Sequence, residues 1–244
     1  MEPNQRWKKN IKKDRYLLLL VAPVILYFFI FHYIPMYGTI LAFKDFSPGQ
    51  TIWNSPWAGF RWFREFFRSV FFGRLISNTF ILSGLSLIIS FPVPILFALL
   101  LNEVKRKNLK RAIQTISYLP HFISLVVMIG ILVNFLSPTD GIINRLLKAM
   151  GKEPINFMEE PTWFRPLYIG SGVWQSFGWN SIIYMASLSS IDPMLYEAAR
   201  IDGCNRWKEM RHITLPGLMP TAVMLLILAL GNLMNVGFEK IILM

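Results

Sequence analysis

Long apolar stretches alternate with shorter polar segments along the chain, and five of these stretches are long enough to cross a bilayer as helices. They cover about 16–43, 75–101, 112–136, 167–191 and 218–236. None of them carries Asp, Glu, Lys or Arg well inside it. Because a helix needs about 20 apolar residues to cross roughly 30 Å of hydrocarbon, the pattern predicts an all-α, polytopic membrane protein built as a helix bundle.

The composition is that of a protein surrounded partly by lipid. Hydrophobic residues make up 54% of the 244 residues and charged residues only 16%, whereas soluble domains carry about a quarter charged residues. The net charge of +11 could also indicate nucleic-acid binding. However, the basic residues cluster beside the apolar stretches, where they set membrane orientation, so we expect no nucleic-acid partner.

The distribution of Lys and Arg between the connecting segments predicts the orientation. Six lie in the tail at 1–15, five in 102–111 and four in 192–216, against five and four in the two opposite loops. Positive residues accumulate on the cytoplasmic side, so we expect the N-terminus in the cytoplasm. The first apolar stretch is too long for the core of a cleavable signal peptide, and we expect it to be retained.

The two opposite connections, expected outside the cell, each contain a predicted short helix. Residues 60–74 place phenylalanines on one helical face and arginines on another, as in a helix that anchors at the membrane interface. Pro138 and Gly141 mark turns around a second short helix. No repeat or linker divides the chain, so we predict a cytoplasmic tail at 1–15 and a single transmembrane domain at 16–244.

The sequence lacks the groups that catalysis or metal binding would need. No GxxxxGK[ST] phosphate loop is present, so any ATP must be bound by another chain. His32, His121 and His212 are scattered without metal-ligand spacing, and Cys204 is the single cysteine. The apolar stretches also lack the carboxylates typical of proton-driven carriers. We therefore expect neither an enzyme nor a metal site.

A polar segment at 192–217 separates the last two apolar stretches. Asp192 followed by Pro193 is a typical helix start, and the following PMLYEAARI is rich in helix formers. Gly203 suits a sharp reversal before a second short helix at about 205–212. Pro216 is expected to forbid helix continuation through the residue before it. The connection is longer than usual for two helices, and its mixed composition suits a groove on another protein.

At these residues the sequence resembles the permease subunits of binding-protein-dependent ABC importers. Their signature loop consists of EAA, three residues, Gly, about nine residues and Ile-x-Leu-Pro, which stands here as Glu197-Ala198-Ala199, Gly203 and Ile213-Thr214-Leu215-Pro216. The segments NTFILS at 78–83, YLPHFIS at 118–124 and the run at 171–203 are similar to the sugar and oligosaccharide branch, particularly to permeases for polysaccharide fragments such as alginate.

The resemblance implies a multi-pass protein of the bacterial inner or plasma membrane with several partners. These are two cytoplasmic ATPases that bind ATP and Mg, a second and usually different permease chain, and an extracytoplasmic binding protein that delivers the sugar or oligosaccharide. No cofactor is expected on this chain itself. The loop at 192–217 would be a coupling helix seated in a cleft of the ATPase. The implied coupling residues are Glu197, Ala198, Ala199, Asp202, Gly203, Leu215 and Pro216.

The number of spans departs from the family pattern. Such permeases usually have six core spans, whereas five are predicted here, so either the sequence is truncated or the last outer loop and helix are missing. Two other functions also stay open at this point. One is an ABC permease for another solute, such as a peptide, a phosphate ester or a metal chelate. The other is a membrane scaffold or receptor whose loop recruits a cytoplasmic protein without transport.

Polar side chains within the apolar stretches are candidates to line a substrate pathway, since lipid penalises them on the outer surface of the bundle. Amides and hydroxyls would bind the hydroxyls of a sugar, and aromatic faces would pack on its ring. Each of these side chains could instead form a hydrogen bond between helices or, if aromatic, lie at the membrane interface. Pro92 and Pro94 predict a kink in the second stretch. The pathway candidates are Asn78, Trp174, Gln175, Asn180, Tyr184, Asn232 and Asn235.

Overall fold

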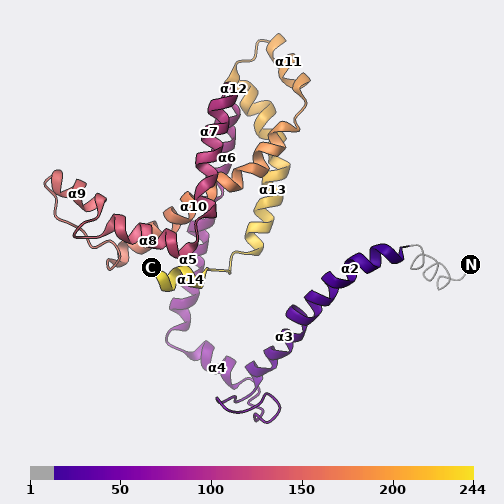
Figure 1. Cartoon of the computed structure of the whole chain (residues 1–244), viewed down its shortest axis with the longest axis vertical. Helices are drawn as coiled ribbons and strands as arrows, with labels where there is room; N and C mark the ends of the chain where they lie inside the picture. Colours follow the sequence, from indigo (N-terminus) through magenta and orange to yellow (C-terminus); the bar gives the residue numbers. More distant parts are fainter. Residues whose placement is uncertain (1–13) are drawn as a thin grey trace, which may run out of the picture. The chain divides into compact units, whose positions relative to one another are not determined.

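The computed structural model describes residues 14–244, most of which are helical (Figure 1). Most of the predicted basic tail therefore lies outside the described residues. The described chain forms two compact units, one ending at Arg74 and one beginning at Leu75. Within 14–244 the only β-type pairing is an isolated bridge between Lys44 and Trp57. The predicted all-α architecture is confirmed.

The first unit contains one long helical segment that matches the first predicted span. It consists of 29 residues, Arg15–Phe43, and none of the side chains of its helices is buried. Such an apolar surface is suited to lipid or to a neighbouring helix. The segment comprises helix α2 (Arg15–Phe28), a π turn (Phe29–Tyr33), helix α3 (Ile34–Met36) and a 3₁₀ segment (Tyr37–Phe43).

Helix α4 (Arg61–Arg68) lies at the predicted amphipathic segment and packs through its aromatic residues. Phe43 is the centre of this cluster, with ring centroids 5.9 Å from Trp57, 5.5 Å from Phe60 and 5.2 Å from Phe63. Polar contacts close the cluster, since Arg61 pairs with Asp45 at 3.1 Å. The expected helix is thus confirmed, whereas its anchoring at a membrane interface stays a prediction.

The second unit is a bundle centred on the longest helix, α10. Its elements are α5 (Phe72–Ser90, from Leu75 onward), α6 (Pro92–Asn102), α7 (Lys107–Tyr118), a 3₁₀ turn (Leu119–Phe122), α8 (Leu125–Leu136), α9 (Ile142–Ala149), α10 (Pro161–Ser189), α11 (Pro193–Ile201), α12 (Arg206–Glu209), a π turn (Met210–Thr214), α13 (Leu215–Gly231) and α14 (Phe238–Leu243). Helices α5 and α6 run on as one 31-residue helical segment, Phe72–Asn102. Phe91, which divides them, keeps helical angles with φ of −72° and ψ of −46°, and the kink expected from Pro92 and Pro94 stays a prediction.

The core of the second unit forms where α10 meets α6 and α13 (Figure 1). Ala98, Leu101, Tyr184 and Leu218 are almost fully buried there. The backbones of α10 and α7 also approach closely, because a Cβ at Gly178 of α10 would overlap the backbone of Ser117 of α7. Small residues let helix backbones come together in this way and gain dispersion energy where water-driven burial is weak.

Three helical segments in residues 14–244 are long and apolar enough to span a membrane: Arg15–Phe43, Phe72–Asn102 and Arg206–Gly231. The predicted third span is not one straight helix, because Lys107–Phe122 and Leu125–Leu136 meet at 101° and count as a fourth span only if taken together. The predicted fourth span lies in α10, which is 29 residues long but carries more polar and small residues.

The bend in the third stretch has a local cause. Ile123 adopts an extended conformation with ψ of 130°, and the hydroxyl of Ser124 then accepts a hydrogen bond from the Val127 amide at 3.3 Å. The chain therefore ends one helix and starts another with a proper N-cap. The 3₁₀ turn around Pro120 precedes this change of direction.

The expectation that Pro216 ends a helix is wrong. Residues Arg206–Gly231 run as one helical segment, and Pro216 lies in the first turn of α13. The Leu215 amide donates to the carbonyl of Met210, five residues back, in the π turn that precedes α13. This wider turn makes room for the proline ring, which in a regular helix would clash with the carbonyl four residues back.

The last predicted span also ends earlier than expected. Helix α13 stops at Gly231, and Asn232 is its C-cap with φ of −97° and ψ of 6°. The residues 232–237 form a turn that leads into α14. Glycine and asparagine are typical of helix ends, because glycine has no Cβ and asparagine can bond to nearby backbone.

Close packing at Gly178 generates a stability test with a control in the same helix. G178A forces α7 away from α10 and is expected to destabilise the bundle by about 1–3 kcal/mol, the usual range for overpacking. G170A meets nothing within 4 Å and is expected to leave stability unchanged. The measurement is the thermal unfolding midpoint of each purified variant in detergent. Equal midpoints for the two variants would contradict the packing described here.

Candidate functional site

Helix α11 begins as its sequence predicts. The Asp192 carboxylate accepts a hydrogen bond from the Met194 amide at 2.9 Å, and Pro193 occupies the first turn. Both features satisfy or remove amides that have no partner at the start of a helix. The helix therefore starts after only three connecting residues, 190–192, so the connection between α10 and α11 is short.

The reversal after α11 depends on Gly203, whose φ is +74°. Only glycine adopts this left-handed conformation without strain. The turn is closed by the Cys204 amide, which donates to the Ala199 carbonyl at 2.9 Å. Asn205 then caps α12, since its side-chain oxygen accepts from the Lys208 amide at 2.9 Å. The predicted helix–turn–helix is confirmed, although its second helix merges with α13.

Two side-chain contacts brace α11 against the start of the α12–α13 segment. Arg200 Nε donates to Glu209 Oε1 at 3.0 Å, and the Glu209 side chain is only 11% exposed. The hydrogen bond to Glu209 raises the pKa of the Arg200 guanidinium, and the charge of Glu209 adds to this effect. The hydroxyls of Tyr196 and Thr214 lie 3.0 Å apart. Together these contacts fix the angle between the two arms of the loop.

A hollow of about 600 Å³ lies beside this brace. Its wall includes Glu197 and Tyr196 of α11 and Glu103 from the end of α6. Arg206 and Glu103 form an ion pair across it at 3.5 Å, but both side chains are exposed to solvent, where such pairs contribute little. The hollow thus brings the predicted coupling loop together with the connection between α6 and α7.

The predicted coupling residues fall into two groups. Glu197, Ala198, Asp202 and Gly203 are exposed and Ala199 is half-buried, so α11 presents a free surface. Leu215 and Pro216 lie instead inside the continuous helical segment, next to the π turn. The role of each residue in coupling stays a prediction.

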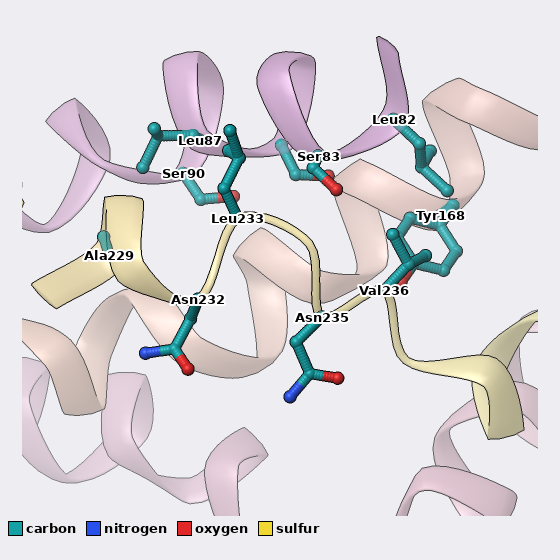
Figure 2. A pocket seen from close by; sticks show the side chains of 11 residues that line it. Leu82, Ser83, Leu87, Ser90, Tyr168, Ala229, Asn232, Leu233, Asn235 and Val236 are labelled. Atoms are coloured by element: carbon teal, nitrogen blue, oxygen red, sulfur yellow. The ribbon is translucent and has the colours of Figure 1, made fainter. Parts of the chain in front are cut away.

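A first pocket of about 240 Å³ lies at the other end of the bundle, between α5, α10 and the turn after α13 (Figure 2). It brings the predicted Asn232 and Asn235 together with Tyr168. Both asparagine side chains project away from α5 in Figure 2. The α5 wall carries the hydroxyls of Ser83, Ser86 and Ser90.

A second pocket of about 220 Å³ adjoins the first, since Ser90 and Ala229 line both. It contains the predicted Asn180 and Tyr184. Four of the seven pathway candidates therefore lie along one face formed by α5, α6, α10 and α13. The lining combines amides and hydroxyls with aromatic and aliphatic surface, which is the chemistry of a site for small polar ligands.

The remaining three candidates lie elsewhere. Gln175 donates to the Ile123 carbonyl at 2.8 Å and so supports the bend between α7 and α8. Trp174 is 44% exposed and lines neither pocket. Asn78 accepts a hydrogen bond from Arg165 at 3.3 Å. For Gln175, the alternative role as a contact between helices is thus the one observed.

Sequence reasoning missed the serines of α5. Ser83, Ser86 and Ser90 follow a spacing of three and four residues, which places them on one face of a helix. Ser86 Oγ is buried and has no hydrogen-bond partner among residues 14–244. That spacing within an apolar stretch is the signal that could have identified them. In the same range, no group of three or more His, Cys, Asp or Glu side chains could hold a metal ion.

Comparison with known proteins shows what kind of protein carries this loop and these pockets. The family described as "Binding-protein-dependent transport system inner membrane component" matches residues 90–237. The chain is also 43% identical over 238 residues to Protein LplB of Bacillus subtilis, covering 98% of this chain and 75% of that protein. The chain belongs to this family. Its residues 90–237 include the loop and both asparagines of the first pocket.

Two further similarities concern named transport systems. The polygalacturonan/rhamnogalacturonan transport system permease protein YteP of Bacillus subtilis is 42% identical over 243 residues, covering 100% of this chain and 76% of that protein. A chain in the crystal structure of a bacterial ABC transporter involved in the import of the acidic polysaccharide alginate is 47% identical, with a TM-score of 0.89 over 98% of this chain and 80% of that chain. This permease is therefore a multi-pass membrane component of an ABC transporter rather than an enzyme.

Removal of the Glu209 carboxylate is expected to loosen α11. In E209A, Arg200 loses its partner, and trypsin is expected to cleave after Arg200 several-fold faster than in the wild-type permease. Cleavage after Lys152, in the connection between α9 and α10, serves as the internal control. The measurement is a time course of fragments by mass spectrometry in detergent. An unchanged rate at Arg200 would mean that the ion pair does not hold the loop.

Proposed function

We propose that this chain is the permease subunit of an ATP-driven importer that moves an oligosaccharide into the cytoplasm. The observation that carries the proposal is helical continuity between the loop and the pockets. Residues Arg206–Gly231 form one 26-residue segment, about 39 Å long at 1.5 Å per residue. Its far end adjoins Asn232 at the first pocket, and α11 follows α10 after only three residues.

This continuity makes the loop a lever. A push on α11 is passed to α10 directly and to α13 through the Arg200–Glu209 and Tyr196–Thr214 contacts. Both helices line the two pockets, so a displacement at one end changes the pocket walls at the other. A rigid element with two positions can couple distant sites if each ligand favours one position.

In this proposal the push comes from a separate ATPase. The exposed face of α11, with Glu197, Ala198 and Ala199, docks in a cleft of that ATPase, and Gly203 sets the angle of the docked helix. ATP and Mg bind to the ATPase and not to this chain, whose sequence has no phosphate loop. Two such ATPases and a second permease chain complete the complex. The loop then lies in the cytoplasm, as does the N-terminus.

The proposed substrate class follows from the pocket chemistry and from the relatives. Serine and asparagine side chains can bind sugar hydroxyls, and the ring of Tyr168 can pack against a sugar ring. The relatives are named for alginate, described as an acidic polysaccharide, and for polygalacturonan and rhamnogalacturonan. A related alginate transporter was solved with an alginate pentasaccharide-bound periplasmic protein. A binding protein is therefore proposed to deliver the oligosaccharide to the end of the bundle opposite the loop.

A substitution that introduces backbone strain at Gly203 tests the role of the loop in coupling. G203V forces a branched residue into a φ of +74°, which costs about 1–2 kcal/mol, so the loop is expected to change shape. Stimulation of ATP hydrolysis by the sugar-loaded binding protein is then expected to be largely lost. G151V provides the matched control, because Gly151 has a φ of +75° in the opposite connection. The measurement is ATP hydrolysis by the reconstituted complex. Full stimulation in G203V would overturn the coupling proposal.

The substrate class is tested with the same complex. Uronate and neutral oligosaccharides, peptides and phosphate esters are screened for stimulation of ATP hydrolysis in the presence of the binding protein. We expect stimulation by an oligosaccharide alone. Stimulation by a peptide or a phosphate ester instead would replace the sugar with that solute. A complex that recruits the ATPase but transports nothing would point to the scaffold function.

A further inference from the structure

Ser86, in the second half of α5, carries a hydroxyl that the permease leaves without a hydrogen bond. Its Oγ is buried, and among residues 14–244 it is the only buried side-chain nitrogen or oxygen atom that has no partner. A serine or threonine inside a helix can donate to a carbonyl one turn back. Thr79, on the same helix, does so to the Leu75 carbonyl at 2.9 Å. Ser86 does not, so its hydroxyl needs a partner from elsewhere.

Packing alone does not account for a serine at this position. An unpaired hydroxyl is unfavourable in the interior, because it gives up its bonds to water and gains none in return. Alanine is equally small and would let the helices approach as closely without this cost. An unsatisfied polar group in a native protein therefore calls for an explanation, and a ligand that completes its hydrogen bond is one.

Ser86 lies on the wall of the first pocket between two further serines. Ser83 and Ser90 line the same pocket, one turn to either side of Ser86. Figure 2 shows the hydroxyl oxygens of Ser83 and Ser90 on the side of α5 that faces the turn after α13. At 1.5 Å per residue, successive serines are separated by about 4.5 and 6 Å along the helix. The three residues form a row of hydroxyls, named here the serine row.

The serine row connects the first pocket with the second. Ser90 and Ala229 line both pockets, and the amides of Asn232, Asn235 and Asn180 lie along the same path. Hydroxyl and amide side chains can both donate and accept hydrogen bonds. Among the described residues, no charged side chain lines either pocket. A neutral molecule segment whose hydroxyls repeat along its length fits such a row better than an ion or an apolar ligand does.

We propose that the serine row binds two consecutive units of an oligosaccharide, one in each pocket, and that Ser86 selects the unit in the first pocket by one of its hydroxyls. This inference rests on the proposed function and assigns a specificity residue to it. Oγ is covered in the sugar-free conformation, and rotation about χ1 carries it between staggered positions. A sugar hydroxyl then completes its hydrogen bond. An analogue without that hydroxyl leaves Ser86 unpaired again and is rejected for that reason.

The first test compares a sugar with its deoxy analogues in the intact complex of full-length permeases and ATPases, without the binding protein. The probes are digalacturonate, dimannuronate and maltose, each with a set of monodeoxy analogues, and the measurement is equilibrium binding. For the disaccharide that binds most tightly, wild type is expected to bind one monodeoxy analogue about tenfold more weakly or worse. S86A is expected to bind that disaccharide and that analogue within about twofold of each other, since their difference depends on Ser86.

The same variant gives a second, independent measurement. S86A removes a buried unpaired hydroxyl, so the thermal unfolding midpoint of the sugar-free complex is expected to stay the same or rise. Its affinity for the disaccharide is expected to fall about three- to tenfold, the loss of one neutral hydrogen bond. Ser176 supplies the control, because its hydroxyl donates to the Gly172 carbonyl at 2.7 Å and the residue lines neither pocket. S176A is expected to bind the disaccharide like wild type.

The number of sugar units is tested with a length series of galacturonate, mannuronate and glucose oligomers. Affinity is expected to rise from the monosaccharide to the disaccharide and to change by less than about twofold from the disaccharide to the trisaccharide, because the two pockets hold two units. Equal affinity for the monosaccharide and the disaccharide would show that only one unit is bound and would overturn the two-unit site.

The remaining outcomes separate this inference from the function on which it rests. Equal affinity of wild type for a disaccharide and all its monodeoxy analogues would overturn the inference and leave the oligosaccharide importer standing. A lower unfolding midpoint in S86A with unchanged discrimination would also overturn it, since Ser86 would then serve the packing of α5. Absence of binding of every probe would overturn it as well. Only if no oligosaccharide stimulated ATP hydrolysis either would the proposed function fail too.

Discussion

The constraint on which the rest of this structure depends is that backbone N–H and C=O groups in hydrocarbon must find partners within the chain. Proline removes one donor and pushes away one acceptor, yet Pro35 and Pro216 both lie in long apolar helical segments. In each case the residue before the proline donates to the carbonyl five residues back, from Ile34 to Phe29 and from Leu215 to Met210. One extra residue in the turn keeps the helix continuous.

That continuity decides how the two ends of the bundle communicate. If Pro216 ended the helix, the loop would connect to α13 through a flexible joint, and a displacement of α11 would be absorbed there. Instead the loop and the pocket wall are parts of one helical segment, Arg206–Gly231. The loop reverses direction at Gly203, and the Arg200–Glu209 pair spans this reversal. The two arms of the loop are therefore held together by a side-chain contact as well as by the turn.

Local signals predicted the loop better than they predicted the bundle. The start of α11 at Asp192 and Pro193 and the positive φ at Gly203 depend on neighbouring residues, and the sequence was sufficient for both. Whether the helix continues through Pro216 depends on whether the preceding turn can widen into a π turn, and no single residue determines that. The roles of Gln175 and Asn232 were equally open, because a polar side chain in an apolar stretch satisfies the same pattern whether its partner is a helix or a ligand.

Hydrogen-bond accounting then separates these roles. Gln175 donates to the Ile123 carbonyl and ties α10 to the bend before α8, whereas Ser181 donates to the Gly178 carbonyl within α10 itself. At the loop end the buried Glu209 carboxylate is paired with Arg200. At the pocket end the buried Ser86 hydroxyl has no hydrogen-bond partner among the described residues. Because buried polar groups are unfavourable unless satisfied, the pocket end is the part of the bundle that a polar ligand would stabilise.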